Sequence, residues 1–167
     1  WAMMEKLQKL SPSFAKGKIH RGYLRRFHRA IHVIDSTTIK LVANCLDWAK
    51  HRRRKAAVKC HMRLNMQSFL PACAVVDTAR FHDASKARDT CAGLKSGEIV
   101  IFGKAYVDFT HLRELDEHGI LWVTRAKDNM QYKVIKQTRH IADQRILRDE
   151  VVELMVTASH KNYSRHL

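Results

Sequence analysis

One carboxylate stands at the end of an apolar run early in the chain. The segment from Ile31 to Leu41 reads IHVIDSTTIKL, in which Asp35 directly follows Val33 and Ile34. β-Branched and apolar residues in a short run are typical of a buried strand, so we expect this strand to deliver an acid to the rim of a sheet. Holding a carboxylate in that place costs free energy unless a cation such as a metal ion binds it. Hydrogen bonds from nearby backbone or hydroxyl groups are the alternative.

The charge of the chain indicates a polyanionic partner. Lys and Arg number 31 against 16 Asp and Glu, which gives a net charge of +15 with neutral histidines. Clustered cations neutralise phosphates, and nucleic acid is the obvious ligand for them. The densest cluster, KHRRRK, begins at Lys50, and we predict that its last four residues contact the DNA backbone: Arg52, Arg53, Arg54 and Lys55. A generally basic, solvated surface is the alternative.

Composition excludes several other classes of protein. No stretch of the sequence approaches the ~20 apolar residues of a membrane span, so we expect a soluble, cytoplasmic protein that does not contact a membrane. The four cysteines contain no C-x-x-C pair, and the eleven histidines have no ligand spacing with them. We therefore expect buried reduced thiols and neither a zinc site nor a redox motif.

The next segment alternates strictly between two kinds of side chain. Apolar residues at even positions from Val58 to Met66 alternate with polar residues at odd positions from Lys59 to Gln67. Such a period of two predicts a strand whose polar face is wet and whose apolar face is buried. A second run, Leu70 to Ala79, follows after a short link, which predicts an antiparallel hairpin.

The remaining pattern completes an alternating order of elements. Asp83 and Asp108 are predicted to cap two helices that end near Gly93 and Gly119. Strands are expected at 98–102 and 120–124. Three strands, a helix, a strand, a helix and a strand are typical of the ribonuclease H-like fold, an α/β mixed sheet flanked by helices. In that fold the first and fourth strands are neighbours, so acids at their ends lie side by side.

Three regions are expected along the chain. Residues 1–30 are basic and partly helical, and residues 31–128 form an incomplete ribonuclease H-like catalytic core. Residues 129–167 begin an inserted β region, in which short strands are expected at 134–135 and 151–156. The chain has no methionine at its head, and we expect it to be a piece of a longer protein.

Five motifs together resemble the DDE-type transposases of bacterial insertion sequences, most closely insertion-sequence family four. The similarity runs from about residue 31 to about residue 155. The motifs are VIDSTTI at 33–39, DWAKHRRRKAAVKCH at 47–61, FHD at 81–83, EIVIFGKAYVDF at 98–109 and WVTRAK at 122–127.

The resemblance implies a specific chemistry. It implies DNA transposition and recombination through an Asp-Asp-Glu triad that holds two divalent ions, Mg²⁺ or Mn²⁺. Asp35 stands where the first catalytic aspartate and metal ligand belongs. Transposon ends, target DNA and a second copy of the protein are the partners implied, in the cytoplasm and at the nucleoid.

The second catalytic aspartate is replaced. The family reads F-D-R-G-Y at the end of the fourth strand, whereas residues 102–106 of this chain read FGKAY, so Gly103 occupies the catalytic position. Glycine has no side chain with which to bind a metal. Asp108 lies five residues further on and is expected to cap a helix instead of replacing the ligand. Lys104, beside the site, is predicted to contact DNA phosphate.

The third acid is absent as well. The family carries its glutamate in a tyrosine, arginine, glutamate, lysine signature after the inserted β region, and Tyr163-Ser164-Arg165 does not match that spacing. We therefore expect a transposase core fragment that binds DNA but is inactive. A non-catalytic DNA-binding remnant that competes with full-length transposase is the alternative. A third hypothesis is that the piece unfolds because one face of its sheet is exposed.

Overall fold

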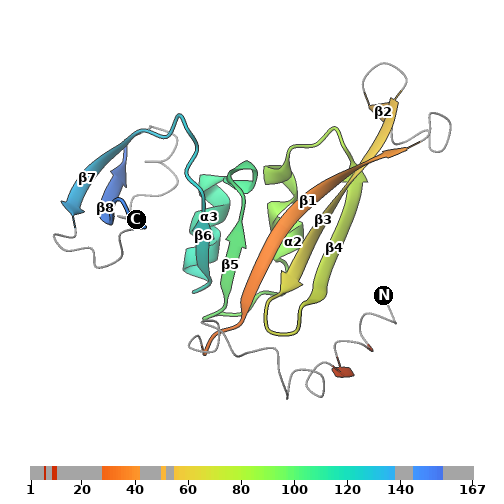
Figure 1. Ribbon diagram of the computed structural model, residues 1–167, viewed down its shortest axis with the longest axis horizontal. Helices are drawn as coiled ribbons and strands as arrows, with labels where there is room; N and C mark the ends of the chain where they lie inside the picture. The colour runs from red at the N-terminus through yellow and green to blue at the C-terminus, as the bar shows by residue number, and fades with distance from the viewer. Residues whose placement is uncertain are drawn as a thin grey trace. The chain divides into compact units, whose positions relative to one another are not determined.

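The computed structural model describes residues 6, 9–10, 28–41, 50–51, 55–137 and 145–155. The chain forms two compact units, Trp1–Arg125 and Ala126–Leu167. The first unit contains a six-stranded sheet (Figure 1). Its strands are β1 (Ile31–Leu41), β2 (Lys50–His51), β3 (Lys55–Asn65), β4 (Leu70–Thr78), β5 (Ile99–Phe102) and β6 (Leu121–Thr124).

The strand order is that of the ribonuclease H-like fold. The sheet runs β3-β1-β5-β6, and both β4 and the two-residue β2 pair with β3. β3 is antiparallel to both of its neighbours β1 and β4, whereas β1–β5 and β5–β6 are parallel pairs. The expected hairpin is present, and Phe69 takes a positive φ of 55° in its turn. The predicted fold class is confirmed, and β2 is an addition that its basic sequence did not indicate.

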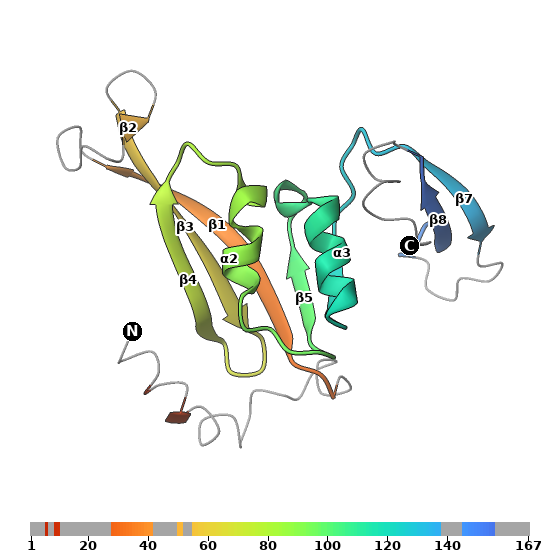
Figure 2. The ribbon, with the colours of Figure 1, turned by 180° about the vertical axis from the view of Figure 1, so that it is seen from behind.

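Two helical segments lie side by side on one face of the sheet (Figure 2). The first consists of η3 (Asp83–Lys86) and α2 (Ala87–Cys91), and the second of η4 (Lys104–Tyr106) and α3 (Phe109–Glu117). Asp108 caps α3, as predicted, because its carboxylate accepts the backbone N–H of His111 at 2.9 Å. A bidentate ion pair from Arg88 to Glu114, at 2.7 and 2.9 Å, links α2 to α3.

The predicted cap at Asp83 is wrong. Asp83 is the first residue of η3, and no side chain caps that helix. The Asp83 carboxylate accepts instead from Ser36 on β1 and from Lys59 on β3. The Ser36 hydroxyl and the Lys59 ammonium together supply two donors to this carboxylate, where a helix cap would supply one backbone amide.

The predicted orientation of β3 is also wrong in its central part. His61 and Arg63, expected to face water, are buried under the helices, with exposed fractions of 1% and 7%, whereas Met62 is 40% exposed. The buried polar side chains have partners: His61 contacts the Tyr106 hydroxyl and Arg63 donates to the carbonyl of Ala92 at 2.9 Å. Hydrogen bonding therefore allows the polar face of β3 to pack inward.

The core lies between the sheet and the helices. Its largest fully buried side chains include Ile34 on β1, Val100 on β5 and Leu112 on α3. Cys91 of α2 is buried as expected, and burial raises the pKa of its thiol to about 11, so the thiol stays protonated. Cys60 and Cys73 are only partly buried, and both are free thiols.

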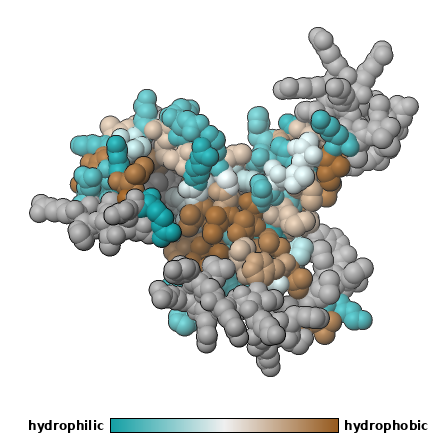
Figure 3. Space-filling view, in the orientation of Figure 1, coloured by the Kyte–Doolittle hydropathy of each residue, from teal (hydrophilic) through white to brown (hydrophobic). Residues whose placement is uncertain are grey.

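The opposite face of the sheet is apolar and open. Side chains that alternate with the core residues have large exposed fractions, including 58% for Val76 on β4 and 52% for Val123 on β6. Figure 3 shows apolar side chains gathered over the strands on the face that Figure 1 presents. This face also carries Met62, Ile101 and Leu121.

The second unit contains a two-stranded antiparallel sheet, β7 (Tyr132–Gln137) and β8 (Glu150–Leu154). Both strands lie where short strands were predicted. β7 extends beyond the predicted 134–135 at both ends, and β8 begins just before the predicted 151–156 and ends before its last residues. Almost all of the predicted N-terminal region, residues 1–30, lies outside the described residues. Among the described residues, no helix is long and apolar enough to cross a membrane.

Candidate functional site

Asp35 projects from β1 just beyond the point where the parallel pairing with β5 ends. The last paired residues are Ile34 and Phe102, so Asp35 is the next residue along the strand. Its side chain is exposed, and its Oδ1 accepts the backbone N–H of Ser36 at 2.8 Å. This is a bond of the kind that the hydrogen-bonding alternative expects. Because the carboxylate is exposed as well, it remains accessible to a cation.

Gly103 follows Phe102 and is therefore the neighbour of Asp35 across the two parallel strands. Adjacent strands lie about 4.8 Å apart, so side chains at the two positions would reach a common point. The backbone of Gly103 has a φ of −71°, which every L-residue adopts readily. A Cβ placed there would meet no atom within 4 Å. Neither backbone conformation nor space thus requires glycine at this position.

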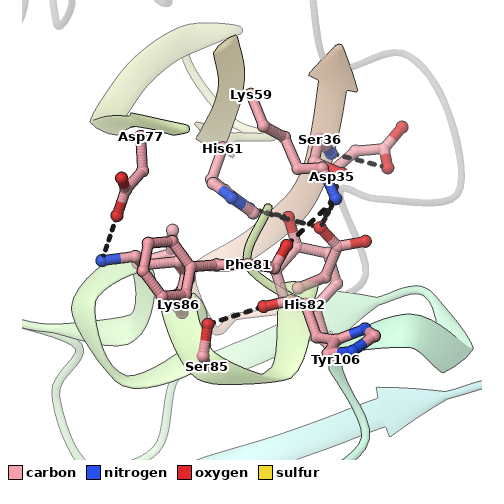
Figure 4. A network of polar contacts seen from close by, with 12 residues as sticks. Asp35, Ser36, Lys59, His61, Asp77, Phe81, His82, Ser85, Lys86 and Tyr106 are labelled. Carbon is pink, nitrogen blue, oxygen red and sulfur yellow. Dashed lines mark hydrogen bonds and ion pairs between the residues drawn. The ribbon is translucent and has the colours of Figure 1, made fainter. Parts of the chain in front are cut away.

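A polar network lies on the helical side of the same strands (Figure 4). Lys59 of β3 donates to Asp83 Oδ1 at 3.0 Å, and the Ser36 hydroxyl donates to the same oxygen at 3.2 Å. His61 Nδ1 lies 2.7 Å from the hydroxyl of Tyr106 and 3.8 Å from Asp83 Oδ1. Residues from β1, β3, η3 and η4 therefore converge beneath the backbone that carries Asp35.

Burial sets the protonation of the network. It lowers the pKa of His61, although the nearby Asp83 carboxylate opposes that shift, so the imidazole is neutral near pH 7. Burial also raises the pKa of Tyr106 well above its usual range, and the phenol keeps its proton. Tyr106 is 2% exposed and also hydrogen-bonds to Ser36. The tyrosine of the FGKAY motif thus joins the turn after Gly103 to β1 and β3.

The described residues do not fit a two-metal site. None of them form a group of three or more His, Cys, Asp or Glu side chains that could hold a metal ion. Asp35 has a glycine for its neighbour in the parallel register. A pair of divalent ions needs several carboxylates directed at one point. The part of the chain described here supplies one.

The other predicted site residues are only partly visible. Arg52, Arg53 and Arg54 lie outside the described residues, and for Lys55 only the backbone, at the start of β3, is described. Lys104 is partly buried, begins η4 and interacts with other groups. The Tyr163–Arg165 segment is also outside the described residues.

Four residues of the network were not singled out as site residues by the sequence. Ser36 and Lys59 looked like ordinary strand residues, and Tyr106 like part of a turn. The useful signal was the FHD motif at 81–83, because its aspartate is the carboxylate on which the network converges. Alternation along β3 predicts His61 on the solvent-facing side, whereas it is buried under the helices.

The fold and the position of Asp35 define a ribonuclease H-like domain with an acid in the middle of its first strand, just beyond the parallel pairing with β5. A family model described as "Transposase DDE domain" matches residues 26–165. The chain belongs to this family, as the sequence motifs predicted.

Two curated proteins are similar to the chain. A putative transposase, y4zB, from Sinorhizobium fredii is 32% identical over 123 residues, which are 74% of this chain and 34% of that protein. A probable transposase for insertion sequence element IS5377 from Geobacillus stearothermophilus is 30% identical over 106 residues, 64% of this chain and 27% of that protein. The chain therefore spans about a third of the length of these relatives.

A search of solved structures found an endonuclease V from Streptomyces avermitilis. It is 9% identical with a TM-score of 0.32, and the match covers 77% of this chain and 56% of that one.

Proposed function

We propose that this chain is part of the DNA-binding catalytic core of a transposase and does not itself cleave DNA. Asp35 is the first acid of the catalytic triad, and Gly103 stands in the place of the second. Arg52, Arg53, Arg54, Lys55 and Lys104 contact DNA phosphates. In this proposal the protein acts on transposon ends and target DNA, and pairs with a second copy, in the cytoplasm at the nucleoid.

One observation supports the proposal most strongly. The parallel register of β1 with β5 makes Gly103 the neighbour of Asp35, which is the relation that two metal-binding acids of this fold need. Membership of the transposase family supplies the class of reaction, and Mg²⁺ or Mn²⁺ is the ion that acids of this type hold. With glycine at position 103 the pair is incomplete, so metal binding and strand cleavage should both be lost.

The same glycine favours the second candidate function. A chain that keeps the basic charge of +15 but lacks an acid pair would bind DNA without cutting it. Such a protein would compete with an intact transposase for the same ends. The two functions differ only in whether the chain works alone or against a full-length relative.

The experiment uses a supercoiled plasmid and the purified chain. We expect DNA retention to fall steeply between roughly 50 and 200 mM salt, because bound phosphates release their counterions. We expect no nicking with Mg²⁺ or Mn²⁺. A flat salt response would contradict the electrostatic argument, and metal-dependent nicking that Asp35→Asn abolishes would contradict the proposed inactivity.

A charge-matched pair of variants locates the DNA contact. Arg52→Ala with Arg53→Ala and Lys95→Ala with Arg113→Ala both remove two positive charges, but Lys95 and Arg113 are exposed residues outside the KHRRRK segment of the sequence. We expect weaker binding and a shallower salt dependence only for the first pair. Equal losses for both pairs would favour the alternative of a generally basic surface.

A further inference from the structure

Ser36 contacts both Asp35 and the polar network. Its backbone N–H donates to Asp35 Oδ1 at 2.8 Å, and its hydroxyl donates to Asp83 Oδ1 at 3.2 Å. The two carboxylates are therefore held by two donors of a single residue. Strand geometry sends neighbouring side chains to opposite faces, so Asp35 faces away from the helices while Ser36 faces the network (Figure 4).

We propose that Asp83 is a positioning residue for Asp35, acting through Ser36. Asp83 holds the Ser36 hydroxyl, and this contact keeps the Ser36 amide directed at Asp35 and so fixes the orientation of the Asp35 carboxylate. The inference rests on the proposed function in one respect, because the value of orienting Asp35 depends on its role as the first acid. The carboxylate that carries the positioning comes from the FHD motif.

The surroundings of Asp83 suit this role. The side chains of Asp83 and Lys59 are only 14% and 17% exposed, so the ion pair between them is shielded from solvent. Lys59 places a positive charge 3.0 Å from Asp83 Oδ1, which offsets part of the cost of burying that carboxylate beside the helices. A charged acceptor in a shielded place binds a hydroxyl more strongly than a neutral acceptor in water does.

The network also holds Ser36 from a second direction. Tyr106 hydrogen-bonds to Ser36 and, at 2.7 Å, to His61 Nδ1. Because Tyr106 and His61 are 2% and 1% exposed, neither can exchange its partner for water. Ser36 is thus fixed between η3 and η4, the elements on either side of the site, and its backbone is restrained just where Asp35 needs a donor.

The test is NMR spectroscopy of the Ser36 amide in the purified full chain, without metal or DNA. Asp35→Ala first calibrates the amide proton shift that accompanies loss of the acceptor oxygen. We expect Asp83→Ala to move the Ser36 amide proton in the same direction and to raise its exchange rate with solvent by about tenfold or more. Asp83→Asn, which keeps an acceptor oxygen for Ser36, should restore most of both values.

Asp77→Ala is the matched control. Asp77 also pairs with a lysine, Lys86, at 2.6 Å, and its other carboxylate oxygen accepts the backbone N–H of Thr78. We expect Asp77→Ala to leave the Ser36 amide unchanged. If Asp83→Ala fails to fold, Ser36→Ala provides the second test, since it removes the hydroxyl and keeps the amide at position 36.

Two results would overturn the proposal. One is that neither Asp83→Ala nor Ser36→Ala changes the proton shift or the exchange rate of the backbone amide at position 36. The other is an equal change in Asp77→Ala, which would indicate general loosening. Neither result depends on DNA or metal, so failure of the positioning role is distinguishable from failure of the proposed function. If Asp83→Ala changes the Ser36 amide as expected but the chain never binds DNA, the positioning role stands and the proposed function fails.

Discussion

At the scale of single residues, Ser36 links Asp35 to the Asp83 carboxylate, which lies far away in the sequence. Asp35 and Gly103 could be placed side by side from strand order and motif, and the parallel register agrees with that placement. The contact between Ser36 and Asp83 joins residues 47 positions apart, and nothing local in the sequence marks it. Periodicity describes neighbours on one element, and this network joins four elements.

Replacement of Gly103 by aspartate should not disrupt the fold. Gly103→Asp needs no new backbone conformation, and its Cβ meets no atom within 4 Å. We expect the free energy of unfolding to change by less than about 1 kcal/mol in the absence of metal. Because two neighbouring carboxylates repel until a cation joins them, Mn²⁺ should raise the midpoint of thermal unfolding for this variant and leave the wild-type chain unchanged.

Gly103→Asn is the control for that experiment, since it has the same size without the charge. Calorimetric titration with Mn²⁺ should give measurable heat of binding for Gly103→Asp alone. A folded Gly103→Asp variant that shows no response to Mn²⁺ would mean that the Asp35 position is not a metal site, whatever the register suggests.

At the scale of elements, the order of β1, β3, β4, β5 and β6 was predictable, and the face that β3 buries was not. Alternation reveals two faces but does not say which one meets the helices. Here the helices cover the face with Lys59, His61 and Arg63, because each of these finds a partner there. The failed prediction at Asp83 has the same origin, because the partners of its carboxylate, Ser36 and Lys59, lie on strands that are distant in the sequence.

The reversed orientation of β3 makes a prediction that alternation alone would invert. His61→Ala removes a side chain that is 1% exposed and withdraws a partner from the Tyr106 hydroxyl, so we expect a loss of about 2–3 kcal/mol in the free energy of unfolding. Met62→Ala removes a side chain that is 40% exposed and should lose less than about 1 kcal/mol. Urea denaturation of the two variants provides the measurement.

His61→Gln separates the two parts of that loss. A glutamine fills much of the cavity and can still bond to Tyr106, so it should recover part of the stability. A larger loss for Met62→Ala than for His61→Ala would restore the original expectation that the apolar face of β3 is buried.

At the scale of the whole molecule, buried histidines on separate elements together make stability depend on pH. His32 on β1, His61 on β3 and His111 on α3 are 6%, 1% and 4% exposed. Burial is the main cause that lowers the pKa of each below its ordinary value. The sequence contains eleven histidines. Their spacing addresses metal binding, but it does not reveal which of them are buried, because burial depends on packing.

Stability should therefore decline as the pH falls below about 6.5. An unfolded chain binds a proton at each histidine near pH 6.5, whereas the folded chain keeps these three imidazoles neutral to lower pH. The contribution is complete above that pH and is lost on acidification, with a slope of at most about 1.4 kcal/mol per pH unit for each histidine. Urea denaturation at pH 8, 7, 6 and 5, at constant ionic strength, measures it.

Variants assign the slope to particular residues. His111→Gln should flatten the decline, because one buried imidazole no longer resists protonation, and His82→Gln should leave it unchanged, because His82 is exposed. A free energy of unfolding that stays level from pH 8 to pH 5 would contradict the role of the buried histidines. The same series tests the hypothesis that the open apolar face leaves the piece unfolded, since an unfolded chain would show no cooperative transition at any pH.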